Sequence, residues 1–321
     1  MRRYVFVRVG NSILMVLVVM SIIFAVVRAL PGDPTSFFVN EAMPQADIMT
    51  QRSRWALDQP LQLQYLHYMK NMITFDFGRS FSAGVTVWEI LGDKLANTLV
   101  LMAPALAMIV TLGAAGGALA GWRRGSKYEQ SGVVLALLFR SVPDFFLALV
   151  ALLVFAFSLK WFPSGGMVSP GTNLSFWEQV ISWDFAAHMA LPLLVIVANR
   201  VSSTFMLMRS SMIEVLGEEF LETLKAKGLS ESQLVRRAAR NALLPLVTYV
   251  GVMVPFLLEG QVVLENVFAW PGIGREIVHA VVNQDYPLMQ GAFFLFAVTI
   301  VVMNLAVDML YGYLDPRVRY A

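Results

Sequence analysis

The chain has 321 residues, of which 57% are hydrophobic and 14% charged, and its net charge at pH 7 is +2. Soluble domains carry about 25% charged residues, so this composition excludes an ordinary soluble protein. The small net charge does not argue for a nucleic-acid partner. Cysteine is absent, which excludes disulfides, thiolate metal sites and cysteine nucleophiles. The three histidines are far apart in the sequence, so we expect no metal site built from them.

Six long apolar runs follow one another along the chain. A helix of about 20 apolar residues crosses a hydrocarbon core of roughly 30 Å, and the strand-like alternation of a barrel is absent. We therefore expect an all-α membrane protein with six transmembrane helices. No small-residue cleavage site follows the basic N-terminus, which predicts that the first helix is retained. The predicted spans cover residues 9–30, 97–122, 132–159, 188–208, 243–264 and 288–311.

Basic residues gather on one side of the predicted spans. Fourteen of them precede span one, follow span six, or lie between spans two and three and between spans four and five. The opposite short connections hold only Lys160 and Arg275. By the positive-inside rule, we expect both chain termini in the cytoplasm. The fourteen residues are Arg2, Arg3, Arg8, Arg123, Arg124, Lys127, Arg209, Lys225, Lys227, Arg236, Arg237, Arg240, Arg317 and Arg319.

This orientation predicts how the chain is divided. Residues 1–30 would hold the cytoplasmic N-terminus and the first span, and residues 31–96 an external segment with aromatic and apolar side chains to bury. Residues 97–312 would form a five-helix transmembrane core, and residues 313–321 a cytoplasmic tail. Within the core, residues 211–245 would form a cytoplasmic segment.

That cytoplasmic segment has the pattern of a helix, a turn and a second helix. Residues 214–227 are rich in helix formers, with acidic residues early and lysines late, as the helix dipole favours. Gly228 stands where a left-handed C-terminal cap is needed. Ser230 and Gln233 have the spacing of a capping box for the second helix.

Three interpretations of this helix pair are open. The first is a cytoplasmic loop without a partner, and the second is a helix-turn-helix that binds DNA. The third is a docking element for a soluble partner. DNA reading is disfavoured, because membrane helices tether both ends and the first helix is acidic. We favour docking, since a docked helix continuous with two spans would pass its partner's motion into the membrane.

The residues before Gly228 resemble the coupling motif of ABC importer permeases, a Glu-Ala-Ala pattern with glycine four residues after its last alanine. Here Glu222 is followed by Thr223 and Leu224, so both alanines are replaced. The interval from Gly228 to Pro245 is longer than in the general motif and is similar to that of the oligopeptide, dipeptide and nickel permease subfamily. Further stretches that resemble this subfamily are residues 30–34, 57–61, 76–80, 141–145, 240–245, 265–274, 285–287 and 314–317.

The resemblance implies a type I ABC importer permease of a bacterial inner membrane. It implies a second homologous permease, two ATP-binding subunits and an external substrate-binding protein as partners. The chain has no phosphate-binding loop pattern, so nucleotide would bind the partners, and we expect neither a cofactor nor catalytic residues here. The implied substrates are short peptides first, then nickel chelates, opines or oligosaccharides. The implied ATPase-coupling residues are Glu222, Thr223, Leu224, Ala226, Gly228, Leu229 and Ser230.

Four ionisable residues within the predicted spans are candidates for the substrate path, because charges at membrane depth are costly and often functional. Arg140 and Asp144 are four residues apart, so on one helix they would share a face and could pair, while Pro143 predicts a kink between them. Arg200 could pair with Glu259, or Glu259 could meet a cationic group of the substrate. The resembled family often has a small residue near position 259.

Residues 270–274, Trp-Pro-Gly-Ile-Gly, predict a tight turn before a short helix. The turn would either close the helix bundle or contact the binding protein.

Two other functional classes remain as alternatives. A secondary transporter would have inverted repeats and paired broken helices, and the sequence has no evident internal repeat. A membrane enzyme would need a convergent acid, base or metal set, which the scattered histidines do not supply. Co-purification of an ATP-binding subunit would distinguish the importer from both.

Overall fold

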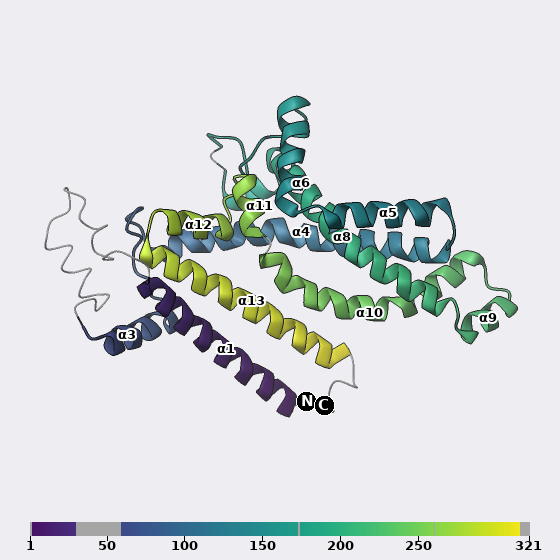
Figure 1. The fold of residues 1–321 in the computed structure, drawn as a ribbon, viewed down its shortest axis with the longest axis horizontal. Helices are drawn as coiled ribbons and strands as arrows, with labels where there is room; N and C mark the ends of the chain where they lie inside the picture. The colour runs from purple at the N-terminus through teal and green to yellow at the C-terminus, as the bar shows by residue number, and fades with distance from the viewer. Residues whose placement is uncertain (1, 30–58, 173, 260, 315–321) are drawn as a thin grey trace. The chain divides into compact units, whose positions relative to one another are not determined.

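The computed structural model describes residues 2–29, 59–172, 174–259 and 261–314, and these residues are helical apart from turns and one isolated bridge between Arg79 and Thr86 (Figure 1). The elements are α1 (Arg2–Ala29), α3 (Leu61–Ile73), α4 (Val87–Trp122), α5 (Lys127–Ser141), α6 (Asp144–Ala151), the π-helical η1 (Leu152–Ser158), α7 (Phe176–Val180), α8 (Trp183–Val215), α9 (Glu219–Ala226), α10 (Glu231–Glu259), α11 (Gln261–Val267), α12 (Ile273–Val282) and α13 (Tyr286–Leu314).

The predicted all-α class is confirmed, with four to five candidate spans. In the described residues, stretches of α1, α4, α8 and α13 are long and apolar enough to cross a membrane. A fifth span results if α5 and α6–η1, which meet at a bend of 100°, are one broken span. The span predicted at residues 243–264 falls on α10 and α11, where many side chains lie outside the described residues, so it stays a prediction.

The first compact unit comprises residues 1–98 and 271–321. Within it α1 and α13 run side by side, as the purple and yellow helices in Figure 1 show. Phe24 of α1 packs against Tyr65 and Tyr68 of α3, and the Ser21 and Tyr65 hydroxyls are 2.7 Å apart. Tyr68 and Met72 are buried, so the described part of the predicted external segment does bury apolar surface, while residues 31–58 lie outside the described residues.

A buried carboxylate organises the start of α13 in this unit. Asp285 is 1% exposed and accepts hydrogen bonds from the Ser80 hydroxyl (2.6 Å), the Ser82 hydroxyl (2.8 Å) and the Ser82 amide (3.0 Å). It also accepts from the Leu288 amide, one of the amides in the first turn of α13 that have no partner within the helix. The loop of residues 78–84 is thereby attached to α13.

The second compact unit comprises residues 99–270, and α8 is its central helix, packed against α5 and α10. Glycines recur every fourth residue of α4, at Gly113, Gly117 and Gly121. A Cβ built on any of the three would clash with α8; on Gly113 and on Gly121 it would lie 2.6 Å from a side-chain carbon of α8. Small residues at this spacing let two membrane helices approach closely.

Candidate functional site

The chain turns back on itself between α8 and α10, and we call residues 216–230 the α9 elbow. The elbow is held by Leu221, the buried residue of α9, which joins a cluster with Met208 and Met212 of α8 and Leu234 and Ala238 of α10. Burying one leucine contributes about 1.5–3 kcal/mol, so this contact attaches the short helix firmly to both long helices. The elbow is therefore packed against both α8 and α10.

The predicted turn chemistry is present at both ends of the turn. Gly228 has φ +81°, a left-handed conformation that costs glycine little and other residues more. The side-chain oxygen of Gln233 accepts a 3.0 Å hydrogen bond from the Ser230 amide, which is the reach-back half of a capping box. Four residues, 227–230, thus connect the end of α9 to the start of α10.

One face of α9 is left free in the second unit. Glu219, Glu222, Thr223 and Ala226 are all exposed, and at about 100° per residue they lie along one stripe, away from Leu221. We call these four residues the outer ridge. An exposed ridge on a helix that is fixed from behind is a surface that a groove on another protein can receive.

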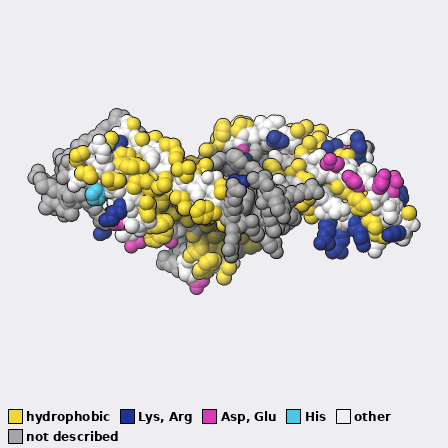
Figure 2. Space-filling view, turned by 90° about the horizontal axis from the view of Figure 1, so that it is seen from below, with side chains coloured by type: hydrophobic (Ala, Val, Ile, Leu, Met, Phe, Trp, Pro, Cys, Tyr) yellow, Lys and Arg dark blue, Asp and Glu magenta, His cyan; other side chains and the backbone are white. Residues whose placement is uncertain are grey.

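A second surface lies on another side of the elbow, between α9 and α10. It is a groove of about 1000 Å³, which we call the basic groove. Figure 2 shows Lys and Arg side chains gathered at the right of the view, where Figure 1 places α9. The groove is lined by Phe220, Thr223, Leu224, Gly228, Leu229, Gln233, Arg236, Arg237, Arg240 and Asn241.

Two polar contacts tie the helices around the elbow together. The Trp122 indole at the end of α4 donates a 2.9 Å hydrogen bond to Glu231 in the first turn of α10. Glu129 of α5 accepts from the Arg209 guanidinium of α8, with Nε at 2.7 Å, and also from the Gly125 amide. Sequence reasoning missed this pair, whose members are 80 residues apart and give no local signal.

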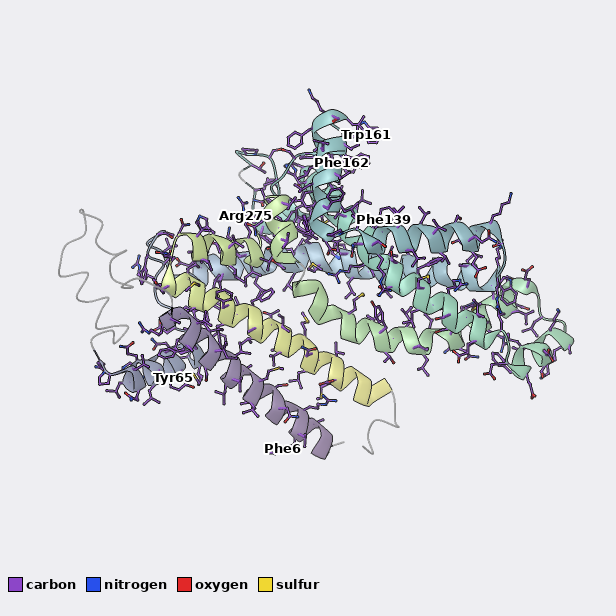
Figure 3. All side chains as sticks on the ribbon, viewed as in Figure 1. Phe6, Tyr65, Phe139, Trp161, Phe162 and Arg275 are labelled. Carbon is purple, nitrogen blue, oxygen red and sulfur yellow. The ribbon has the colours of Figure 1, made fainter. Side chains whose placement is uncertain are left out.

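The break between α5 and α6 confirms the predicted kink at Pro143. Val142 is extended, as the residue before a proline prefers, and the two helices meet at 100°. The Asn199 side chain of α8 donates to the carbonyls of Phe139 (3.3 Å) and Val142 (3.1 Å), which have lost their helical donors. Figure 3 labels Phe139 where α5 meets α6. Sequence reasoning also missed Asn199, although an amide within an apolar span was a signal.

The expected pairing of Arg140 with Asp144 is wrong, because the break removes the shared helix face. Asp144 instead pairs with Arg200 of α8, with Arg200 Nη2 3.3 Å from Asp144 Oδ2. Arg140 is exposed and lines a separate pocket with Ser203, Tyr249 and Arg209. The side chain of Glu259, the last residue of α10, lies outside the described residues, so its proposed contacts remain untested.

A double-mutant cycle tests the pairing of Asp144. Asp144→Asn and Arg200→Gln should each lower the midpoint of thermal unfolding, and the double variant should lose less than the sum, with a coupling of about 0.5–1 kcal/mol because both side chains are about one-third exposed. Arg140→Gln combined with Asp144→Asn is the control and should be additive. Coupling in the control cycle and additivity in the first would contradict the assignment.

The turn at residues 270–274 has its tryptophan inside the second unit. Trp270 is 0% exposed, and its ring lies 5.8 Å from that of Phe185. A short helix follows the turn as predicted, and α12 already begins at Ile273, within the stretch 270–274. The tryptophan is therefore a packing residue, which favours the bundle-closing interpretation over contact with a binding protein.

The family described as binding-protein-dependent transport system inner membrane component matches residues 113–320, and its N-terminal counterpart matches residues 1–102. The chain belongs to this family. The predicted resemblance is confirmed, and the chain is an inner-membrane subunit of a binding-protein-dependent transport system. Its elbow and the break between α5 and α6 are therefore parts of a transport subunit and not of an enzyme.

Relatives match this permease over nearly its whole length. A Brucella suis biovar 1 (strain 1330) protein is 36% identical over 323 residues, 99% of each chain. The oligopeptide transport system permease protein AppB of Bacillus subtilis (strain 168) is 32% identical over 322 residues, 100% of each chain. The dipeptide transport system permease protein DppB of Escherichia coli (strain K12) is 35% identical over 315 residues, 92% of this chain and 93% of that protein.

Proposed function

We propose that this chain is one permease subunit of an ATP-driven ABC importer and forms half of the translocation path for short peptides. The substrate class is supported by relatives named for oligopeptide and dipeptide transport that match the chain almost from end to end. Nickel chelates, opines and oligosaccharides have no comparable support. The partners would be a second homologous permease, two ATP-binding subunits and an external binding protein, with both termini of this chain in the cytoplasm.

The observation that carries the coupling role is the α9 elbow. Its outer ridge is exposed, while Leu221 packs the elbow against α8 and α10. The contacts of Trp122 and Arg209 in turn tie α10 to α4 and α8 to α5. A push on the ridge by an ATP-binding subunit would therefore move α8 and α10 as a unit instead of bending a loop. Three of the predicted coupling residues, Glu222, Thr223 and Ala226, lie on the outer ridge. The others would hold the ridge in place, and they are Leu224, Gly228, Leu229 and Ser230.

Bulk placed on the ridge tests this role. Ala226→Trp should leave the amount of permease in the membrane unchanged, because the residue is exposed. It should reduce ATP-driven uptake of a labelled dipeptide about 30-fold, the loss typical of a disrupted interface centre, and should reduce co-purification of the ATP-binding subunits.

Lys127→Trp is the matched control, because it places the same bulk on an exposed residue at the start of α5 that is not part of the elbow. It should transport like the unmodified complex. Unchanged uptake and co-purification in Ala226→Trp would overturn the coupling role. If unlabelled short peptides did not reduce uptake of the labelled dipeptide, only the proposed substrate class would be overturned.

A further inference from the structure

The basic groove is lined by three arginines that form no ion pair within the described residues. Arg236, Arg237 and Arg240 are its ionisable lining residues, and no carboxylate lines it. All three arginines are exposed, and no ion pair to them is found within the described residues. Arg236 and Arg240 are one helical turn apart, a spacing at which like charges repel. An anion placed between them would relieve this repulsion.

The acidic residues of the elbow point elsewhere. Glu219 and Glu222 belong to the outer ridge, on a different side of α9 from Phe220 and Leu224, which line the groove. Glu231 is held by the Trp122 indole. The groove thus combines three guanidinium groups with apolar lining from Phe220, Leu224 and Leu229. A ligand that fits it has an anionic group attached to an apolar part.

The length of α8 places the groove near the depth of lipid headgroups. α8 begins at Trp183, which is 87% exposed, and exposed tryptophan marks a membrane interface. From Trp183 to Met208 the helix rises about 38 Å, at ~1.5 Å per residue, whereas a bilayer with its headgroups measures about 40–45 Å. Met208 shares a buried cluster with Ala238 and Ala242 of α10. Arg237 and Arg240, which flank Ala238, are therefore at the level of the opposite headgroup layer.

We propose that the basic groove is a binding site for an anionic phospholipid, with the phosphate between Arg236, Arg237 and Arg240 and the start of an acyl chain along Phe220 and Leu224. Guanidinium groups suit phosphate, because their planar forks donate two parallel hydrogen bonds to its oxygens. The site lies on the elbow and shares Thr223 with the outer ridge, but the three arginines, Phe220 and Leu224 lie off the ridge, so the inference does not rest on ATPase docking there. A lipid in the groove would hold α9 against α10.

The test measures lipid retention by the whole purified permease complex. The complex is reconstituted in nanodiscs of phosphatidylcholine with phosphatidylglycerol, re-extracted in mild detergent and assayed for bound phosphatidylglycerol by mass spectrometry. Less phosphatidylglycerol should be retained by the triple variant Arg236→Gln, Arg237→Gln, Arg240→Gln. The loss should reach up to about fivefold per arginine, because that factor corresponds to the attraction of one basic side chain to an anionic surface. The triple variant Arg123→Gln, Arg124→Gln, Lys127→Gln removes the same charge outside the groove and should retain phosphatidylglycerol normally.

Equal losses in the two triple variants would overturn the proposal, because the attraction would then be unspecific. Normal lipid retention in the groove variant with loss of the ATP-binding subunits would also overturn it, and would assign the groove to a protein partner. A failure of the coupling role is detected separately, as unchanged uptake in Ala226→Trp, and does not depend on the lipid retained by the groove variant.

Discussion

Gly117→Leu is expected to destabilise the permease by about 3 kcal/mol, the upper end of the usual cost of overpacking. A Cβ on Gly117 would clash with the Phe205 carbonyl oxygen and lie 2.8 Å from Met208 Cβ and 3.0 Å from the Arg209 amide nitrogen. Two of these neighbours are backbone atoms, which cannot rotate away, so α4 and α8 must separate. At about 2–4 °C per kcal/mol, the midpoint of thermal unfolding should fall by roughly 6–12 °C.

Gly92→Leu is the matched control, because Gly92 lies in the same helix and a Cβ there would meet nothing within 4 Å. It should keep or slightly raise the midpoint, since leucine favours a helix over glycine by up to about 1 kcal/mol. Both variants are measured as the purified permease in one detergent. Similar losses in the two variants would show that the close approach of α4 and α8 does not explain the effect.

Asp285→Asn is expected to weaken the attachment of the loop at residues 78–84 to α13. The carboxylate of Asp285 accepts all its hydrogen bonds, and the asparagine amide would turn a donor toward the Ser80 and Ser82 hydroxyls or the Ser82 amide. Hydrogen bonds to charged groups contribute about 1.5–3 kcal/mol each, and a buried unpaired group costs a similar amount, so we expect a loss of about 3 kcal/mol.

Hydrogen exchange of the amides in residues 78–86 measures this attachment directly, because local opening exposes them. Exchange should accelerate about 100-fold for a loss of ~3 kcal/mol. Ser82→Ala is the graded control: it removes one donor and leaves the carboxylate bonded to the Ser80 hydroxyl and the Ser82 amide, so it should cost only about 1 kcal/mol. Faster exchange in the control than in Asp285→Asn would contradict the role assigned to the carboxylate.

The sequence by itself determined the properties that depend on nearest neighbours along the chain. Long apolar runs predicted membrane helices, and four described helices have that length and composition. Gly228 and the Ser230–Gln233 pair predicted the turn of the elbow, because helix caps are made by residues within four positions of each other. Family membership followed from the order of many short stretches, and the full-length relatives confirm it.

Only the tertiary structure decided which polar residues meet. Residues four apart face each other only within a continuous helix. Because the chain breaks at Pro143, Asp144 pairs with Arg200 and not with Arg140. α5 and α8 are far apart in the sequence but pack side by side. This packing brings Arg209 to Glu129 and Asn199 to the carbonyls at the break. Low-dielectric surroundings favour a partner for a buried polar group, but packing decides which partner is within reach.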